Sequence, residues 1–363
     1  ASCLAKRPLL YGSYPITPAS DILHELSRLQ NFDIKTFQAE DEIAAIGASI
    51  GASYGGALGV TGTSGPGLTL KSESLGLAVM TELPLVVIDV QRGGPSTGLP
   101  TKSEQTDLLQ SLFGRNGESP LAVLAPSSPS NCFSIVIEAC KIAMEYMTPV
   151  VVLSDGYLAN SSEPWKIPAV DALPNMRVEE GKITDPFLPY ARNKDTLSRP
   201  WVMPGTKGLA HRIGGLETED ETGNVSYDGP NHQKMIMLRA EKIGKIADRI
   251  PTLEIEGEKT GELLVLGWGS TCGTIRSAAE AARDEGAAVS YTHLRHINPL
   301  PKNTGQVLRN FKKILVPELN SGQLAMVLRA KFLIDIKGLN KLEAQPFKIR
   351  EIKEKIFDML EKE

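Results

Sequence analysis

A threonine held between two prolines is the first residue whose setting suggests chemistry. In "YPITPAS" the two prolines bracket Ile16 and Thr17. Proline fixes its own φ and disfavours helical backbone in the residue before it, so this dipeptide stays extended ahead of the helix predicted over 21–29. The corner is either a tight strand-to-helix turn in which Thr17 or Ser20 caps that helix, or a rigid support that presents Thr17 to a ligand.

Three carboxylates stand at the head of a run of small residues, "AEDEIAAIGASIGASYGG", which begins at Ala39. Acids in the first turn of a helix interact favourably with its dipole, which is a sufficient explanation for Glu40 and Asp41. Each glycine inside a helix costs about 1 kcal/mol relative to alanine, so the small-residue face indicates close approach of another backbone or of a flat ligand. Glu42, at the head of that face, is therefore our candidate for a functional carboxylate.

Two further motifs could bind anions. "TSGPG", which contains Ser64 and Gly65, could present backbone N–H groups to a phosphate at a helix start. It lacks the lysine of a P-loop, and it is also typical of a tight turn. In "DVQRGGPSTGLPTKSEQTDL", Arg92 directly follows an apolar run, and its planar fork suits a carboxylate. Thr101 and Lys102, later in the same loop, could contact the same anion. The alternative is that Arg92 is a solvated surface residue.

The order of predicted elements indicates how these residues come together. Over residues 1–165 continuous apolar strands alternate with helices, including helices predicted over 68–83 and 104–114. This order is typical of a parallel sheet covered on both faces. Ligands of such sheets bind beyond the carboxyl ends of the strands. Because Thr17, "TSGPG" and Arg92 all fall at such ends, we expect them to share one crevice.

The rest of the chain divides into two parts. Residues 166–258 form an irregular connecting segment with a helix near its end, and irregular segments of this length are usually disordered or functional. Aromatic residues indicate that this segment packs on the rest of the molecule: Phe187, Tyr190, Trp201 and Tyr227. Residues 259–363 return to βαβ order and predict a smaller α/β domain, in which 287–297 is expected to be one strand.

Composition excludes several classes of protein. A net charge of −4 without blocks of like charge gives no nucleic-acid surface and no anionic-membrane surface. No apolar run reaches the ~18 residues of a membrane span. The four cysteines are scattered without a Cys-x-x-Cys pair, and we expect Cys132 and Cys140 to be buried apolar residues. This favours a reducing cytoplasm and no metal or cluster held by this chain alone. The opening "ASCLAKRPLL" is typical of a helix end, so we expect residues upstream of Ala1.

Together, "YPITPAS", "FQAEDEIAAIGA", "TSGPG" and "DVQRGGPSTGLPTKSEQTDL" resemble the alpha subunit of 2-oxoacid:ferredoxin oxidoreductases, most of all the 2-oxoglutarate branch. The likeness continues through "LSDGYLANSSEPWKIP", "GLAHRIGGLETED", "TGNVSYDGPNHQKM" and "ILVPELNSGQL", and so covers nearly the whole chain. It implies a pyrimidine-type thiamine diphosphate domain followed by a transketolase-C-terminal-like α/β domain. It also implies oxidative decarboxylation of a 2-oxoacid, with electrons passed to ferredoxin and the acyl group to coenzyme A.

The resemblance implies a role for each motif residue. Glu42 matches the glutamate that hydrogen-bonds the aminopyrimidine ring and favours its imino tautomer. Ile16, Thr17, Ser64 and Gly65 would lie beside the same cofactor.

The substrate residues follow from the same resemblance. Arg92 matches the arginine that pairs with the 1-carboxylate of the substrate, and Thr17 and Thr101 would complete that pocket. The two prolines would then hold Thr17 ready for the substrate.

The departures from the family pattern predict partners. The Gly-Asp-Gly motif that holds the diphosphate and Mg²⁺ in this family does not occur here, and neither does a cysteine set for a [4Fe-4S] cluster. By the resemblance both belong to a beta subunit, so that this chain supplies half of a site in a hetero-oligomer. The gamma-type domain that many relatives carry would be a separate subunit or lie upstream.

Alternatives remain at this point. The substrate could be pyruvate or a branched-chain 2-oxoacid. Lys102, or His211 and Arg212 in "GLAHRIGG", could bind a second carboxylate and so select 2-oxoglutarate. A rival from another class is a non-catalytic assembly or nucleotide-binding subunit that shares the fold, which would not need a carboxylate at position 42.

Overall fold

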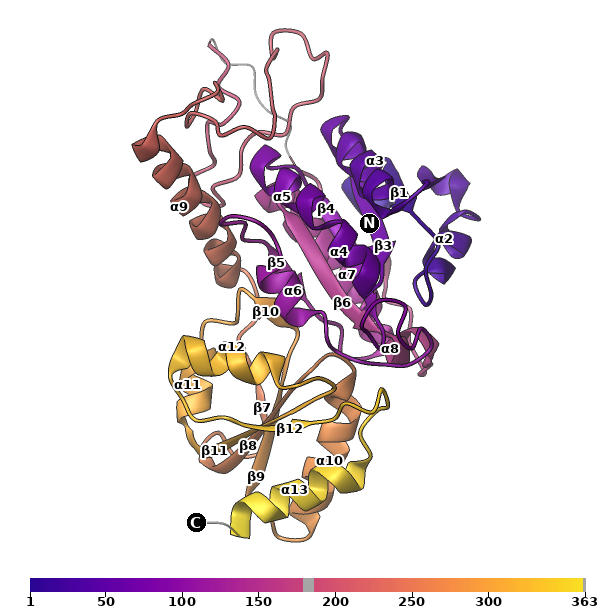
Figure 1. Ribbon diagram of the computed structural model, residues 1–363, viewed down its shortest axis with the longest axis vertical. Helices are drawn as coiled ribbons and strands as arrows, with labels where there is room; N and C mark the ends of the chain where they lie inside the picture. The colour runs from indigo at the N-terminus through magenta and orange to yellow at the C-terminus, as the bar shows by residue number, and fades with distance from the viewer. Residues whose placement is uncertain (179–185, 362–363) are drawn as a thin grey trace.

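The structure, a computed structural model, describes residues 1–178 and 186–361, and over these ranges two mainly parallel sheets organise the chain (Figure 1). The first sheet has the order β10-β5-β6-β4-β3-β1-β2 and is parallel except for the edge strand β10. Its strands are β1 (Leu9–Ser13), β2 (Ile34–Gln38), β3 (Leu58–Thr63), β4 (Leu85–Gln91), β5 (Ala122–Leu124), β6 (Pro149–Asp155) and β10 (His296–Asn298).

The second sheet is smaller and has the order β12-β11-β8-β9-β7, with β7 antiparallel to β9. Its strands are β7 (Ile255–Glu256), β8 (Gly261–Trp268), β9 (Val289–Leu294), β11 (Phe311–Glu318) and β12 (Lys337–Asn340). Helices α10 and α13 pack on each other beside it, and α11 and α12 contact β11. These helices are α10 (Cys272–Asp284), α11 (Thr304–Arg309), α12 (Gln323–Phe332) and α13 (Ile349–Glu361). The predicted arrangement of two α/β domains is confirmed.

Helices cover both faces of the first sheet because successive strand residues point to opposite sides. Val87 of β4 packs with the face formed by α3, α4, α5 and α6, whereas its neighbour Val86 packs with α2 and α7. The helices of this domain are α1 (Ser2–Ala5), α2 (Ser20–Leu26), α3 (Glu42–Tyr54), α4 (Gly65–Leu70), α5 (Ser72–Thr81), α6 (Leu108–Phe113), α7 (Pro129–Tyr146) and α8 (Gly156–Asn160). Short 3₁₀ turns lie at η1 (Gln30–Phe32), η2 (Val170–Ala172), η3 (Ile246–Asp248) and η4 (Gly269–Thr271).

Three predicted elements are wrong in their extent. The helix predicted over 68–83 is broken at Lys71, whose buried ammonium donates to the Glu42 carbonyl (2.8 Å). The helix predicted over 104–114 begins only at Leu108, because the preceding backbone bonds to the second domain instead. The single strand predicted over 287–297 is two strands, β9 and β10, which belong to different sheets and so tie the domains together.

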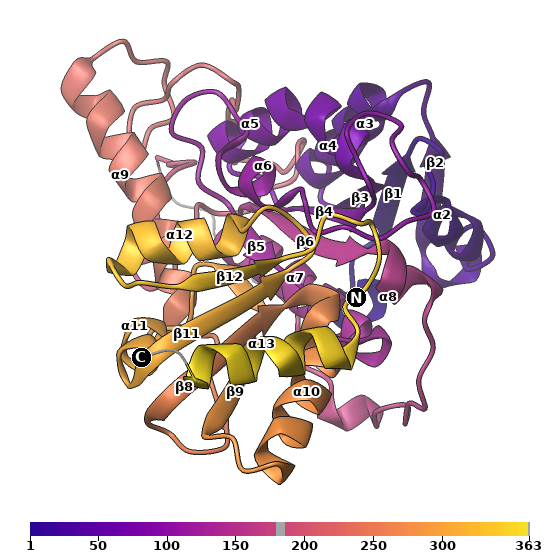
Figure 2. The same ribbon diagram turned by 60° about the horizontal axis from the view of Figure 1, so that its bottom comes forward.

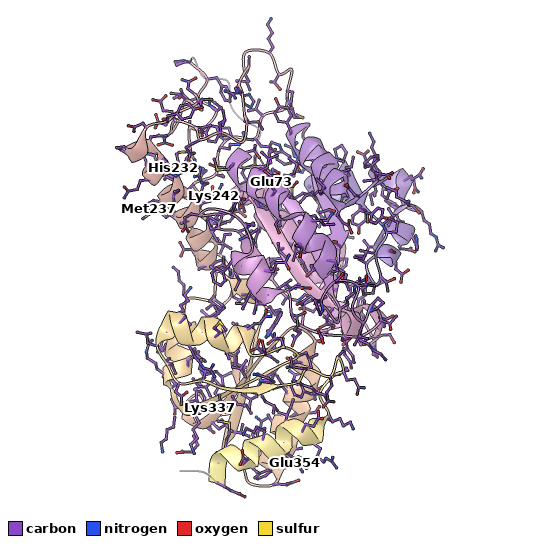
Figure 3. The ribbon with its side chains drawn as sticks, viewed as in Figure 1. Glu73, His232, Met237, Lys242, Lys337 and Glu354 are labelled. Atoms are coloured by element: carbon purple, nitrogen blue, oxygen red, sulfur yellow. The ribbon has the colours of Figure 1, made fainter. Side chains whose placement is uncertain are left out.

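The connecting segment packs on the first domain through buried ion pairs. Helix α9 (Gly229–Lys245) turns Lys242 towards that domain and Met237 away from it (Figure 3). Glu82 is fully buried and accepts from Lys242 (2.6 Å) and from Arg192 (2.6 Å). Burial would raise the pKa of Glu82, but these two cations hold it at about 2. The segment is therefore fastened to the end of α5.

The aromatic residues of the segment behave differently from one another. Tyr190 and Trp201 are buried as expected, and the Trp201 indole donates to the Ser53 carbonyl (2.9 Å). Tyr227 is 90% exposed, so the expectation that it packs is wrong. None of the helices in the described ranges combines the length and apolar composition that crossing a bilayer requires.

The two domains meet over the segment that joins β4 to α6. Helix α12 lies beside α6 in both views (Figures 1 and 2). The carboxyl ends of β8 and β11 face the residues just before α6, where Gln105 bonds to Trp268 and Leu319. One apolar core also continues through the contact, from Leu108 to Leu266. This contact fixes the loop that carries several of the predicted site residues.

Candidate functional site

The predicted crevice lies at the carboxyl edge of the first sheet. Strands β1, β3 and β4 are parallel neighbours and end at Ser13, Thr63 and Gln91. The chain leaves these ends towards Thr17, "TSGPG" and Arg92, so the sequence placed all three motifs correctly at one edge.

Arg92 and Thr17 are brought into direct contact. The Arg92 side chain is only 7% exposed, and its Nη1 donates to the Thr17 carbonyl (2.5 Å). Its Nε is buried and has no hydrogen-bond partner among the described residues. The interpretation of Arg92 as a solvated surface residue is therefore wrong, and the guanidinium keeps a buried donor for another group.

The helix-cap explanation of the threonine corner is wrong. The N-cap of α2 is Ala19, whose methyl side chain cannot accept a hydrogen bond, and the Ser20 hydroxyl donates back to the Ile16 carbonyl (3.2 Å). Ile16 is half-buried, whereas the Thr17 side chain is exposed. The backbone of the corner is thus held by Ser20 and by Arg92, which leaves the Thr17 hydroxyl free to face a ligand.

Two cavities open beside this contact. One of about 380 Å³ is lined by Gly65, Arg92 and Asp107. The other, of about 530 Å³, is lined by Thr17 and Thr101, and the second domain contributes residues 344–346 to it. The exposed Lys102 lines this second cavity too. The motifs expected to share one crevice therefore line two cavities, with Thr17, Thr101 and Lys102 in one and Gly65 and Arg92 in the other. The hydrogen bond from Arg92 to the Thr17 carbonyl connects the two.

Glu42 lies at the start of α3 with its side chain turned inward. Its neighbour Asp41 is the N-cap and accepts from Ala44 N (2.7 Å), as the helix-dipole interpretation of Asp41 requires. Glu42 is only 7% exposed, and its side chain lies against Gly67, where an added Cβ would stand 3.0 Å from Oε1. Lys71 contacts the backbone of Glu42, and burial lowers its pKa to about 8. The negative charges of Glu42 and Asp41 oppose this effect but are smaller than it.

The "TSGPG" turn contains a buried, unpaired hydroxyl and a glycine that the Asp107 carboxylate approaches closely. The Ser64 hydroxyl is buried and unpaired within the residues that the structure describes. A Cβ on Gly65 would stand 2.7 Å from Oδ1 of Asp107, so only glycine fits between α4 and that carboxylate.

A buried carboxyl pair at this edge was missed from the sequence. Asp89 on β4 is fully buried, and its carboxyl group faces that of Asp107. Burial and the Asp107 charge raise the pKa of Asp89 well above its ordinary value, and burial raises the pKa of Asp107 to about 6. As an ionised group, Asp89 would have no donor for either oxygen among the described residues, so a shared proton is the arrangement that satisfies both. The available signal was a charged residue inside the otherwise apolar strand "LVVIDVQ".

The small-residue helix α3 has two different faces. On its buried face, glycines of the strands allow close packing: a Cβ on Gly12 would stand 2.4 Å from the Ala45 carbonyl. On its outer face, Gly47 and Gly51 have open space: apart from their chain neighbours and the backbone of the helix itself, no atom of the described residues lies within 4 Å of an added Cβ. Ile43, on the same helix, is 51% exposed. The strand backbones thus explain the small residues on the buried face, whereas the outer face is exposed.

Other candidates lie elsewhere. His211 hydrogen-bonds the Leu209 carbonyl through Nδ1 (2.8 Å) and packs edge-on against Phe187. Among the described residues, neither His211 nor Arg212 lines the cavities at Arg92 and Thr17. Cys140 is buried as expected, whereas Cys132 is only partly buried, and all four cysteines are free. Over residues 1–178 and 186–361, no group of three or more His, Cys, Asp or Glu side chains is placed to hold a metal ion.

Comparison with known families gives two matches along the chain. Residues 2–228 match the family described as pyruvate flavodoxin/ferredoxin oxidoreductase, thiamine diphosphate binding, and residues 261–349 match pyruvate:ferredoxin oxidoreductase core domain II. The chain is 58% identical over 97% of its length to the 2-oxoglutarate oxidoreductase subunit KorA of Mycobacterium tuberculosis, of which it spans 54%. It is 34% identical over 96% of its length to the 2-oxoglutarate synthase subunit KorA of Methanothermobacter marburgensis, of which it spans 93%.

Solved structures agree with these matches. The 2-oxoglutarate:ferredoxin oxidoreductase of Magnetococcus marinus, solved with 2-oxoglutarate, coenzyme A and succinyl-CoA bound, superposes with a TM-score of 0.94 at 35% identity. The alignment covers 99% of this chain and 63% of that one. A split-gene transketolase superposes with a TM-score of 0.55 at 13% identity, which shows the fold alone. This chain therefore belongs to the 2-oxoacid:ferredoxin oxidoreductase family, as an alpha-type subunit similar to those of the 2-oxoglutarate branch.

Proposed function

We propose that this chain is part of a thiamine-diphosphate-dependent enzyme that oxidatively decarboxylates 2-oxoglutarate. The overall reaction takes 2-oxoglutarate and coenzyme A to succinyl-CoA, CO₂ and a proton, with one pair of electrons passed to ferredoxin, and it can run in either direction. The observation that carries the proposal is the contact of buried Arg92 with the Thr17 corner, at the sheet edge where family members would bind substrate. The similarity to subunits of 2-oxoglutarate oxidoreductases and synthases favours 2-oxoglutarate over pyruvate or a branched-chain 2-oxoacid.

The residues of this edge fit the aminopyrimidine end of thiamine diphosphate. The unpaired Ser64 hydroxyl offers a polar contact, and Gly65 and Gly67 leave no room for side chains of their own. When bound, the cofactor supplies stabilisation of the carbanion formed next to the cleaved carboxylate. Glu42 would hold a proton between its carboxylate and a ring nitrogen, and Ile16 and Thr17 would lie beside the ring.

The substrate would enter next to Arg92. Its guanidinium is held in place by Thr17, and the free Nε can donate to the 1-carboxylate. Thr101 can add a hydroxyl donor from the cavity that it shares with Thr17. Lys102, in the same cavity, could meet a second carboxylate.

A partner would complete the site. A subunit seated on the outer face of α3 around Gly47 and Gly51 would cover the side of this helix that the chain leaves open, while the Glu42 side chain is turned inward on the other side. We assign the diphosphate, Mg²⁺ and [4Fe-4S] sites to this beta subunit, with a gamma subunit or domain, ferredoxin and coenzyme A as further partners. Free cysteines throughout are consistent with a cytoplasmic enzyme.

The test is the reaction of the purified complex. The chain is expressed with its co-purifying subunits, its bound thiamine diphosphate is quantified, and viologen reduction with coenzyme A is measured for 2-oxoglutarate, pyruvate and a branched-chain 2-oxoacid. We expect reduction to be fastest with 2-oxoglutarate. Preference for another 2-oxoacid would overturn the substrate assignment. A complex that contains no thiamine diphosphate and reduces no viologen would favour the non-catalytic alternative.

A further inference from the structure

Gln105 joins the substrate loop to the second domain through a dense set of buried hydrogen bonds. The residue is 0% exposed. Its Nε2 donates to the Trp268 carbonyl (2.9 Å), and its Oε1 accepts from Leu319 N (3.1 Å). Its backbone N–H donates to the Leu319 carbonyl (3.1 Å), and its own carbonyl accepts from Asn320 Nδ2 (2.6 Å). Both polar ends of the side chain and both backbone groups are therefore satisfied by the other domain.

The second domain is shaped to receive this side chain. Gly269, at φ +61°, stands where a Cβ would lie 2.6 Å from Gln105 Nε2, so a side chain there would collide with the glutamine. Asn320 is in turn bonded to the buried Glu318, which also accepts from Leu324 N (2.8 Å) at the start of α12. Gln105 is thus received by the end of β8 at Trp268 and by the hydrogen-bonded turn that joins β11 to α12.

Backbone hydrogen bonds within the loop couple the position of Gln105 to that of Arg92. Residues 92–102 close on themselves, because Gly93 N donates to the Lys102 carbonyl (3.0 Å) and Lys102 N donates to the Leu99 carbonyl (3.0 Å). Arg92 and Thr101 therefore sit on the two limbs of one closed loop. Gln105 follows three residues after the closing pair, where a shift of the chain would move both limbs together.

We propose that Gln105 is a positioning residue, through which the second domain sets the location of Arg92 and Thr101 for substrate binding. The proposal rests on the proposed function, since it concerns the same carboxylate pocket. It goes beyond that function by giving the second domain a direct part in substrate affinity. If Gln105 merely holds the domains together, its loss lowers stability without affecting the loop.

The experiment compares Gln105→Ala with Asn303→Ala in the purified complex. Asn303 is a matched control, because its side chain also makes two hydrogen bonds to the backbone of one residue, Leu253 (2.8 and 2.9 Å), away from the loop. For Gln105→Ala we expect kcat/KM for the 2-oxoacid to fall about 10- to 100-fold, mainly through KM, with thiamine diphosphate content unchanged. Asn303→Ala should leave KM unchanged. Equal KM values in the two variants and the unaltered complex would overturn the proposal.

Amide hydrogen exchange tests the same idea without activity. The amides of Gly93, Leu99 and Lys102 should exchange faster in Gln105→Ala than in Asn303→Ala, and equal protection would overturn the proposal. If the unaltered complex turns over no 2-oxoacid, the proposed function fails, and this exchange still decides whether Gln105 positions the loop. Should Gln105→Ala fail to assemble, Gln323→Ala takes its place, because Gln323 Nε2 donates to the Thr106 carbonyl from the second domain (2.8 Å).

Discussion

Replacing Glu42 by glutamine separates a catalytic carboxylate from a structural one. The substitution keeps the size of a buried side chain that lies against Gly67, so the helix start should survive. The hydrogen bond from Lys71 goes to the Glu42 backbone carbonyl and is also retained. What disappears is one negative charge and the ability to share a proton with a ring nitrogen.

The two interpretations predict effects of different kind and size. If Glu42 activates the cofactor, exchange of the C2 proton of bound thiamine diphosphate should slow by about 10²–10⁴-fold, the usual range for one general acid–base group. If it only complements the helix dipole, the change should cost about 0.3–1 kcal/mol in the free energy of unfolding and leave exchange unaffected. Deuterium exchange at C2, followed on the assembled complex, distinguishes the outcomes.

Asp41→Asn is the matched control. Asparagine is as good an N-cap as aspartate, so the cap to Ala44 should be kept. Both variants remove a charge that raises the pKa of Lys71, so an effect transmitted through Lys71 would appear in both. Slow exchange in Glu42→Gln alone supports the catalytic role. Normal exchange in a folded, cofactor-loaded Glu42→Gln complex would refute it, and with it the assignment of this edge to thiamine chemistry.

Three further predictions concern the rest of the site. Arg92→Lys keeps the charge but loses the fork, so we expect KM for the 2-oxoacid to rise about tenfold or more with cofactor content unchanged, and unaltered initial-rate kinetics in Arg92→Ala would contradict this. A leucine at position 51 would have open space in this chain, so Gly51→Leu should not lower the thermal stability of the isolated chain. It should abolish co-purification of the partner subunit, and a normal complex would show that α3 does not form the subunit interface. The pKa of Asp107 is raised to about 6 by burial, so the stability that its proton contributes is complete below about pH 4 and is lost as the pH rises through 6. Asp107→Asn should flatten that fall in the free energy of unfolding between pH 5 and 7.5, measured with urea, and an unchanged slope would count against the carboxyl pair.

Local patterns were sufficient to place the main motifs. Strand ends are encoded by where apolar runs stop, which is why Thr17 and Arg92 could be assigned to one edge. The division into residues 1–165, 166–258 and 259–363 follows the same patterns and stays a prediction. The roles of Glu42 and Arg92 stay predictions as well, because the structure supplies their surroundings and not their reactions.

Long-range pairing is what the patterns could not supply. The backbone before Leu108 reads as helix, but Gln105 finds partners in residues more than two hundred positions away. Likewise, β10 is three residues long and continues the pattern of β9, so no local signal shows that it changes sheet. The proton that Asp89 and Asp107 are expected to share depends on two segments that only the fold brings together.

The Arg92 loop and the outer face of α3 differ in how far this chain itself surrounds them, and this difference bears on assembly. On the substrate side, Arg92 is held by Thr17, its loop is closed on itself, and the second domain clamps the loop through Gln105. Helix α3, by contrast, presents Gly47 and Gly51 with open space on its outer face, while the Glu42 side chain at its start is turned inward. We propose that another subunit approaches closely at this face, so that this chain would place the substrate and the assembled complex would complete the cofactor site.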